Sequence, residues 1–236
     1  MKSLNILVLT AVVLSGCARA HDPAYALVRL APTCAREGVR LTIVGDSLAR
    51  GLGASADKNS FASIIYANVR QTSPKTTMRN LGKPGATTDE IAVAEVPQIR
   101  AGRCSLVVII AGANDVQKLY TPAHFGVSYT KLLQKVRARL PLGALVVMGL
   151  PDVSLSPRIP WALKPLESWL SRDANASVAQ AAREYGAAFV PLYAVSHREA
   201  YRSKSLLSSD GIHPSDEGYR IMAGTALPSV MMVLRR

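Results

Sequence analysis

The stretch that decides the fold is Val39-Arg-Leu-Thr-Ile-Val-Gly-Asp-Ser-Leu48. Five of its first six residues are aliphatic or β-branched, which is typical of a buried strand. Gly45 permits a sharp exit from that strand. Ser47 then follows at the carboxyl end of the strand, where open α/β sheets bind their ligands. A nucleophilic serine at this place requires a base, a group that orients the base, and donors for an oxyanion.

Strands and helices alternate along the rest of the chain. Apolar runs predict four more strands, and amphipathic patterns between them predict helices. The strands are expected at residues 76–81, 105–111, 144–148 and 187–191. The helices are expected at residues 60–71, from 87 to a bend or end near Pro97, at 122–140 and 165–184, and from 215. This alternation predicts an α/β fold with one parallel sheet and helices on both of its faces.

The composition is that of one folded domain. The chain has 236 residues, of which 49% are apolar and 19% charged, so disorder is not expected. The net charge is +12, but the lysines and arginines are spread along the chain without a block of five or six like charges. We therefore expect no nucleic-acid partner. Weak attraction to an anionic envelope surface stays open.

The N-terminus has the pattern of an export signal. A short basic start, Met1-Lys2, precedes an apolar run over residues 4–14 that is too short for an ordinary transmembrane helix. The run ends in Leu14-Ser-Gly-Cys17, which resembles a bacterial lipobox, where cleavage before the cysteine leaves Cys17 as the lipid-modified first residue. The alternative is a plain signal peptide with an incidental cysteine.

This pattern divides the chain into three parts. Residues 1–16 are expected to form the lipoprotein signal peptide, residues 17–38 a lipidated tether, and residues 39–236 the folded domain. The predicted location is the bacterial cell envelope, where lipid on Cys17 holds the exported domain at a membrane surface. Ala18 is compatible with sorting to an outer membrane, and the choice between inner and outer membrane stays open.

Two further cysteines, Cys34 and Cys104, lie just before predicted strands. Neighbouring parallel strands would bring them together, and an exported compartment permits a disulfide. Two separate buried thiols are an equal alternative. No metal-ligand spacing is present, so no metal site is expected.

Candidate catalytic groups follow several of the predicted strands. Ser47, Gly85 and Asn114 lie in three loops at one predicted edge of the sheet, and a later loop carries Asp210 and His213. Positions three apart in a turn can face the same side, so Asp210 is expected to accept the Nδ1 proton of His213. The other ring nitrogen would then take the hydroxyl proton of Ser47. The N–H groups of Ser47 and Gly85 and the amide of Asn114 are expected to form an oxyanion hole.

Four motifs in this order resemble the SGNH, or GDSL-type, family of esterases and lipases. Gly45-Asp-Ser-Leu48 matches the first motif, Asn80-Leu-Gly-Lys-Pro-Gly85 resembles the second, Gly112-Ala-Asn-Asp115 matches the third and Asp210-Gly-Ile-His213 the last. The resemblance covers roughly residues 39–232. It implies a flavodoxin-like three-layer α/β/α sandwich with a five-stranded parallel sheet. It also implies hydrolysis of esters or thioesters through a seryl intermediate, without metal or cofactor. Gly85 aligns with the oxyanion glycine of the family, and Gly82 is its rival.

Other polar residues are assigned structural roles. Asp46 is expected to shape the loop around Ser47 rather than to be the acid of the triad, and Asp115 is expected to be structural. His124 and His197 have no matching acid motif nearby and are assigned to the structure or the surface.

Two remaining features concern the surroundings of the site. Gly149-Leu-Pro-Asp152 follows a strand at the same edge and either shapes the pocket or only turns the chain. Trp161 and Trp169 are expected in the core or in helix packing rather than in an acyl-binding wall.

The main hypothesis is a serine esterase that acts on carboxylic esters or thioesters, with acyl or acetyl groups carried by lipids, glycans or small molecules. One alternative is an envelope acyltransferase that uses the same triad. The other is a lipoprotein that binds acyl or glycan ligands without turnover. The pattern of residues does not fix the acyl chain length, the substrate or the oligomeric state.

Overall fold

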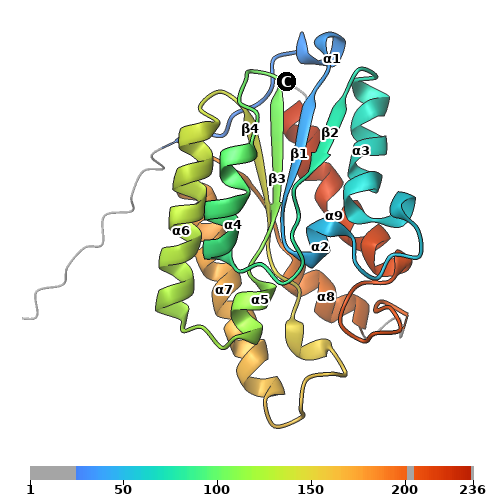
Figure 1. The fold of residues 1–236 in the computed structure, drawn as a ribbon, viewed down its shortest axis with the longest axis vertical. Helices are drawn as coiled ribbons and strands as arrows, with labels where there is room; N and C mark the ends of the chain where they lie inside the picture. Colours follow the sequence, from blue (N-terminus) through green and yellow to red (C-terminus); the bar gives the residue numbers. More distant parts are fainter. Residues whose placement is uncertain (1–24, 201–204, 235–236) are drawn as a thin grey trace, which may run out of the picture.

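The computed structural model describes residues 25–200 and 205–234. Within these residues five strands form one parallel sheet in the order β2-β1-β3-β4-β5 (Figure 1). The strands are β1 (Arg40–Gly45), β2 (Thr77–Asn80), β3 (Ser105–Ile110), β4 (Ala144–Met148) and β5 (Ala188–Val190). The predicted fold, a five-stranded parallel sheet in a three-layer α/β/α sandwich, is confirmed.

Helices cover both faces of the sheet. One face is packed by α2 (Ser47–Arg50), α3 (Phe61–Thr72) and α9 (Asp216–Leu234), and the other by α4 (Thr88–Ala94), α6 (Pro122–Arg139) and α7 (Lys164–Glu184). Shorter elements are α1 (Cys34–Glu37), α5 (Ala113–Gln117), α8 (Leu192–Ala200) and the 3₁₀ turns η1 (Asp57–Asn59), η2 (Val96–Gln98) and η3 (Val153–Leu155). None of the helices in the described part of the chain has the length and apolar character needed to cross a bilayer.

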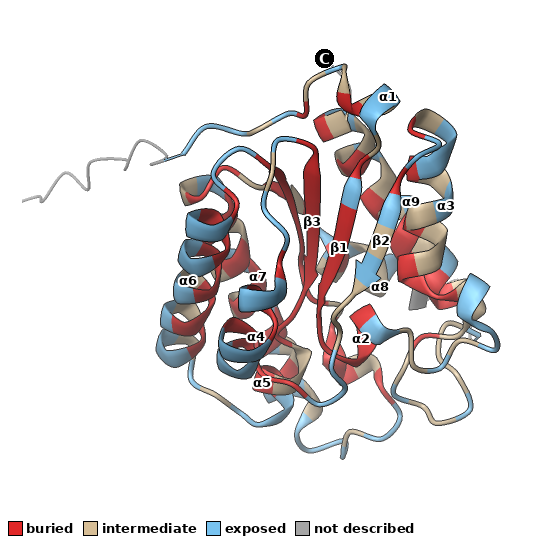
Figure 2. Cartoon of the chain, turned by 45° about the horizontal axis from the view of Figure 1, so that its top comes forward, coloured by how far each residue is buried: buried red, intermediate tan, exposed pale blue. Residues whose placement is uncertain are grey.

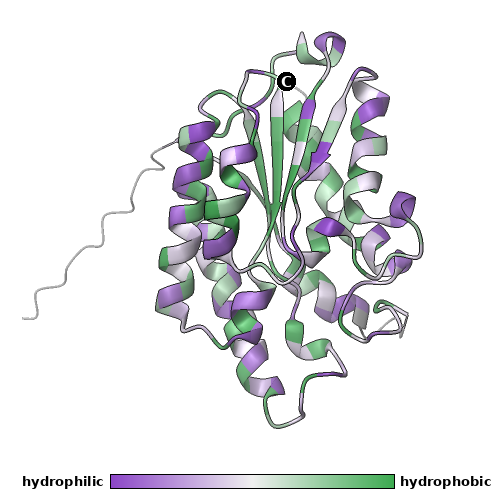
Figure 3. Cartoon of the chain, viewed as in Figure 1, coloured by the Kyte–Doolittle hydropathy of each residue, from purple (hydrophilic) through white to green (hydrophobic). Residues whose placement is uncertain are grey.

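The central strand β3 divides the core into two halves. Its side chains alternate, so Leu106, Val108 and Ile110 pack with α3 and α9, whereas Val107 and Ile109 pack with α4, α6 and α7. All of these side chains are buried, and Figure 2 shows β1 and β3 as buried almost throughout. Figure 3 shows β3 and β4 as apolar strands between helices that carry many hydrophilic residues. A continuous apolar run is therefore what a strand covered on both faces requires.

Two predicted helix starts are confirmed by their caps. The Ser60 hydroxyl accepts a hydrogen bond from the N–H of Ser63 at the start of α3. Thr87 and Glu90 form a reciprocal capping box at the start of α4. Pro97 lies in the 3₁₀ turn η2 directly after α4, which ends that helix as expected.

Four short helices were not expected from the sequence: α1, α2, α5 and α8. Those that follow β1 and β3 are four and five residues long. Such segments are too short to show a helical period of apolar residues. Both begin at the edge of the sheet where the polar candidates lie.

Residues 25–38, which the sequence assigned to the tether, pack against the domain. Leu30 is buried, and its N–H donates to the carbonyl of Val233 over 2.8 Å. The rings of Tyr25 and Tyr185 stack with centroids 5.6 Å apart. The predicted signal peptide, Cys17 and the remaining tether lie outside the described residues.

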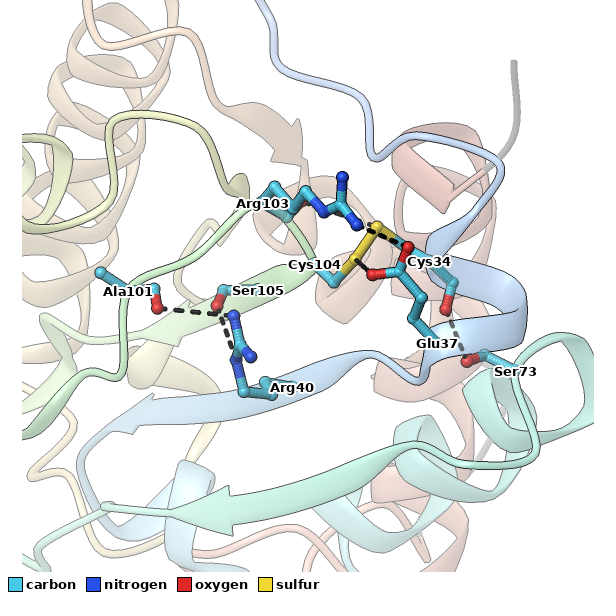
Figure 4. The surroundings of a disulfide bond; sticks show 8 residues. All are labelled: Cys34, Glu37, Arg40, Ser73, Ala101, Arg103, Cys104 and Ser105. Atoms are coloured by element: carbon cyan, nitrogen blue, oxygen red, sulfur yellow. Dashed lines mark hydrogen bonds and ion pairs between the residues drawn. A yellow bond between two sulfur atoms is a disulfide. The ribbon is translucent and has the colours of Figure 1, made fainter.

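A disulfide joins Cys34 to Cys104, which settles the choice between a disulfide and two thiols (Figure 4). It forms because β1 and β3 are neighbours, with Arg40 opposite Ser105 in the parallel register. The Cα atoms of the two cysteines lie 5.3 Å apart. An exposed ion pair between Glu37 and Arg103 lies beside the bond. The disulfide therefore ties the N-terminal segment to the start of the central strand.

We expect the double variant Cys34→Ser/Cys104→Ser to lose about 2–4 kcal/mol of unfolding free energy, because the bond closes a long loop in the unfolded chain. The loss is measured by urea unfolding followed by circular dichroism. Reductant should lower the stability of the wild-type chain to that of the double variant and leave the variant itself unchanged. Equal stability of the oxidised wild type and the variant would contradict a stabilising role.

Candidate active site

Ser47 is placed by the sharp exit from β1. Gly45 has a φ of +145°, and a Cβ atom there would lie 1.8 Å from the carbonyl oxygen of Ile110, so only glycine fits. The Asp46 carboxylate then accepts a hydrogen bond from the N–H of Leu48 over 2.9 Å and caps α2. Asp46 therefore shapes the turn, as predicted. Ser47 is the first residue of the helix, and its N–H has no partner among the described residues.

Two buried carboxyl groups, those of Asp46 and Glu95, accept hydrogen bonds from the backbone of this turn. Burial raises the pKa of Asp46 to about 7; the hydrogen bond from Leu48 opposes this rise, and repulsion from Asp115 adds to it. Burial likewise raises the pKa of Glu95 to about 7, although the Gly45 N–H donates to it over 2.8 Å. One oxygen of Asp46 and one of Glu95 have no hydrogen-bond partner within the described structure. The turn is thus held by acids that bind a proton far more readily than exposed ones.

Gly85 lies in a tight turn after β2. The N–H of Ala86 donates to the carbonyl of Lys83 over 3.1 Å, with Pro84 and Gly85 between them. Gly85 has a φ of +78°, and proline followed by such a glycine is the pattern of a type II turn. The turn leaves the N–H of Gly85 without a partner in the described part of the chain.

The N–H of the rival glycine, Gly82, already has a hydrogen-bond partner within the protein. Its N–H donates to the side-chain oxygen of Asn80 over 2.9 Å. A Cβ at residue 82 would lie 2.7 Å from the backbone nitrogen of Arg50, whereas one at Gly85 would meet nothing within 4 Å. Of the two, only Gly85 lines the cavity described below. The geometry therefore favours Gly85 as the oxyanion donor.

Asn114 lies on α5, directly after β3. Its amide donates to the carbonyl of Ala86 over 3.0 Å, which joins it to the turn that carries Gly85. An amide has two N–H groups, so one remains for a ligand. Asp115, beside it, accepts a hydrogen bond from the N–H of Thr88 over 3.0 Å and so fixes the start of α4. Asp115 has the structural role that the sequence suggested.

Asp210 and His213 meet in one loop before α9. The Oδ2 atom of Asp210 lies 2.7 Å from Nδ1 of His213. The other oxygen of Asp210 accepts hydrogen bonds from Ser208, Ile212 and the backbone of His213. Desolvation acts to raise the pKa of Asp210, but these hydrogen bonds, that of His213 first, hold it well below its usual range. The carboxylate stays ionised and orients the imidazole.

Ser47, Gly85, Asn114 and His213 all line one cavity of about 780 Å³. Its walls are mainly apolar and include Leu52, Val153, Leu155, Leu192, Val195 and Ile221. The structure thus brings together every sequence-predicted site residue of the domain, with Asp210 behind His213. The Ser47 hydroxyl makes no hydrogen bond to the described residues.

A second acid–histidine pair was missed by sequence reasoning. Nε2 of His197 lies 2.6 Å from Oδ2 of Asp152, whose side chain is fully buried. Asp152 accepts hydrogen bonds from the Ser154 N–H and the Ser168 hydroxyl. It lines the cavity, so Gly149-Leu-Pro-Asp152 shapes the pocket wall as well as turning the chain. Asp152 and His197 are 45 positions apart, so local patterns could not reveal their contact, and the one signal was the polar end of a predicted strand.

The expectation that the two tryptophans lie in the core was wrong, although neither lines the cavity, as expected. Trp161 is 84% exposed and Trp169 is 44% exposed. Both lie around the start of α7, where the helix extends beyond the elements that pack on it (Figure 1). Among the described residues, no group of three His, Cys, Asp or Glu side chains is arranged to hold a metal ion.

Fold and site together define a hydrolase built on a parallel α/β sheet. The model of the GDSL-like Lipase/Acylhydrolase family matches residues 43–221 of the chain. The chain belongs to this family. Comparison with the curated proteins gives no match.

Solved structures share the fold at low sequence identity. A lipolytic protein of the G-D-S-L family from Veillonella parvula DSM 2008 superposes with a TM-score of 0.67 at 16% identity, over 82% of this chain and 99% of its own. TesA superposes with a TM-score of 0.65 at 19% identity, over 83% and 99%. A single-residue variant of Axe2, an acetyl xylan esterase from Geobacillus stearothermophilus, gives 0.64 at 17%, over 84% and 98%.

The raised pKa of Asp46 predicts a pH-dependent effect of Asp46→Asn on stability. The folded state holds a proton that the unfolded state releases, so this group lowers the unfolding free energy as the pH rises from about 4 to about 7. Asparagine keeps an oxygen for the Leu48 N–H and has no charge to desolvate. We expect the variant to gain stability relative to wild type across this range, by up to about 4 kcal/mol. Urea unfolding from pH 4 to 8 measures it, and a difference independent of pH would contradict the assignment.

Proposed function

We propose that this chain is a serine esterase that hydrolyses carboxylic esters or thioesters through a seryl intermediate. The observation that carries the proposal is the convergence of Ser47, His213 and three oxyanion donors on one cavity. Asp210, at 2.7 Å from Nδ1, holds the imidazole in the tautomer that leaves Nε2 as a base. Membership of the acylhydrolase family supports the same chemistry.

The first half of the proposed reaction forms the acyl-enzyme. The Ser47 oxygen attacks the carbonyl carbon while Nε2 of His213 takes the hydroxyl proton. The negative charge moves to the carbonyl oxygen, where the N–H groups of Ser47 and Gly85 and the amide of Asn114 stabilise it. When the tetrahedral intermediate collapses, the bond to the leaving oxygen or sulfur breaks. His213 gives its proton to that leaving group.

The second half repeats these steps with water. His213 takes a proton from a water molecule that attacks the acyl-serine ester, and the same three donors hold the oxyanion. Collapse breaks the bond to Ser47, which recovers its proton from His213. The carboxylic acid leaves and the enzyme returns to its first state.

The cavity favours an acyl group larger than acetyl. Its volume of about 780 Å³ lies within the range of sites that enclose a drug-sized molecule. The lining is mainly apolar and includes leucine, valine and isoleucine side chains. Such walls gain most from an alkyl chain, at about 0.8 kcal/mol per buried methylene. A sugar acetate would leave this apolar surface without a partner.

We also propose that the domain works outside the cytoplasm, attached to the cell envelope by lipid at Cys17. The disulfide between Cys34 and Cys104 supports an oxidising compartment. The lipobox-like Leu14-Ser-Gly-Cys17 supports lipid attachment. Lipid on a soluble domain would keep it at a membrane surface.

The catalytic proposal is tested with Ser47→Ala on a series of aryl esters and thioesters from acetyl to long-chain acyl. We expect wild-type activity to increase beyond acetyl and the variant to lose at least about a thousandfold in kcat/KM. Ser209→Ala is the matched control, because Ser209 lines the same cavity and has no proposed catalytic role. Undiminished hydrolysis by Ser47→Ala would exclude Ser47 as the nucleophile. Analysis of the products with added alcohol acceptors separates hydrolysis from transfer.

Lipid attachment is tested by growing bacteria that express the full chain with labelled palmitate. We expect label and detergent-phase partitioning for the wild type and neither for Cys17→Ser, because a thiol is needed at the new N-terminus. The control is Cys34→Ser, which removes a different cysteine. Equal labelling of wild type and Cys17→Ser would contradict the proposal.

A further inference from the structure

Residues 157–169 form an exposed apolar tip at one end of the molecule. We call this segment the tryptophan tip. The exposed fractions of Trp161, Leu163, Leu166 and Trp169 are 84%, 37%, 41% and 44%. In Figure 1 the tip lies at the lower end of the long axis, at the start of α7. Large apolar side chains gathered at an exposed end commonly mark a surface that binds a partner or a membrane.

The tip is held in a defined shape rather than loosely exposed. The N–H of Leu163 donates to the carbonyl of Pro160 over 2.9 Å, which closes a turn around Trp161. The ammonium group of Lys164 donates to the carbonyls of Ser154 and Ser156, over 2.6 and 2.9 Å. Leu166 and Trp169 are three positions apart and share one helix face. The backbone that carries these exposed apolar side chains is therefore held in place by hydrogen bonds.

The tip is joined directly to the proposed catalytic loop. Pro157, its first residue, lines the cavity. The guanidinium of Arg158 donates to the carbonyl of Asp210 over 2.8 Å. Just before the tip, the Ser156 hydroxyl donates to the carbonyl of Gly211 over 2.6 Å. A surface that contacts the tip would lie beside the entrance to the site.

The exposed charges in and near the tip are positive, which favours an anionic partner. The tip contains two cations, Arg158 and Lys164, and Arg172 is exposed one turn further along α7. Its one carboxyl group, Glu167, is buried. The whole chain carries a net charge of +12, so a second copy would repel the first. An anionic lipid surface instead attracts these cations and accommodates tryptophan at its interface.

We propose that the tryptophan tip docks on an anionic lipid surface and holds the mouth of the cavity against it. Trp161, Leu166 and Trp169 enter the interface between headgroups and acyl chains, while Arg158 and Lys164 stay at the headgroups. The part of the proposal that names ester lipids of that surface as substrates rests on the proposed function. The docking itself does not depend on catalysis.

Docking at the tip would orient the domain on the membrane, which a lipid anchor alone would not do. The N–H of Tyr25, where the described chain begins, donates to the carbonyl of Glu184, the last residue of α7. The tip lies at the opposite end of the same helix, which is 21 residues long. An anchor that leads into Tyr25 would tether the domain without orienting its cavity. A second contact at the tip would turn the cavity toward the membrane.

The test uses the fluorescence of the two tryptophans, which are the only ones in the sequence and both lie in the tip. The full chain carries Cys17→Ser, so no lipid is attached there. With vesicles of phosphatidylglycerol and phosphatidylcholine we expect a blue shift and quenching by brominated acyl chains. Both effects should weaken with phosphatidylcholine alone or at about 0.5 M salt. Unchanged emission with anionic vesicles would overturn the proposal. A blue shift that grows with protein concentration in the absence of vesicles would overturn the proposal, because it would show that the tip binds a second copy of the chain instead of lipid.

Sedimentation with the same vesicles compares Trp161→Ser/Leu166→Ser with the control Leu142→Ser. Leu142 is 68% exposed and precedes β4, at the opposite edge of the sheet from the cavity. We expect the tip variant to bind at least about tenfold more weakly, a difference of about 1.4 kcal/mol per factor of ten, and the control to bind like wild type. Equal binding by the tip variant would overturn the docking role.

Two substrates separate docking from catalysis in these variants. The tip variant should hydrolyse a water-soluble short-chain ester at the wild-type rate, which also shows that it is folded, but lose activity on esters embedded in anionic vesicles. Equal loss on both substrates would overturn the docking role. No hydrolysis by any variant, wild type included, would overturn the proposed function and the lipid-substrate part, while the fluorescence result still decides docking.

Discussion

The close approach of Gly45 to the carbonyl oxygen of Ile110 is the constraint on which the site depends. β1 lies between β2 and β3, so whatever follows β1 leaves the sheet between the loops that follow its two neighbours. A Cβ at residue 45 would lie 1.8 Å from that oxygen, and the chain could not turn there. Because it does turn, Ser47 comes out between the loop of Gly85 and the loop of Asn114. One contact between neighbouring strands thus sets the position of the Ser47 hydroxyl relative to the donors of the proposed oxyanion hole.

The buried acids then decide which backbone donors remain for a substrate. Glu95 takes the N–H of Gly45, Asp46 takes that of Leu48, and Asp115 takes that of Thr88. These are the donors that fix the three loops in place. The N–H groups of Ser47 and Gly85 have no hydrogen-bond partner among the described residues, and both residues line the cavity. Burying carboxyl groups costs free energy, and the raised pKa values of Asp46 and Glu95 record that cost. Loop geometry is thereby maintained without using the donors that chemistry would need.

How much could be predicted from the sequence depended on the range of the contacts involved. The strands were predictable because alternation and apolar runs are local, and Asp210 and His213 were predictable because they are three residues apart. The Cys34–Cys104 bond was left open because both a disulfide and two thiols fitted the strand starts. The Asp152–His197 contact was missed because it joins α8 to a loop 45 residues earlier. The prediction for Trp161 and Trp169 failed for a related reason. A large apolar side chain is expected in the core, but these two lie where α7 extends beyond its neighbours and are exposed.

The walls of the cavity are coupled to the surface through one carboxyl group. Asp152 accepts hydrogen bonds from Ser154 in η3 and Ser168 in the first turns of α7, and it contacts His197 in α8. η3 and α8 supply apolar cavity wall through Leu155, Leu192 and Val195, while the first turns of α7 carry exposed apolar side chains of the tryptophan tip. A buried carboxylate that loses a partner is left with an unpaired charge, which is costly. Asp152 therefore joins the three segments through one side chain, so the start of α7 is connected to two parts of the cavity wall by direct contacts.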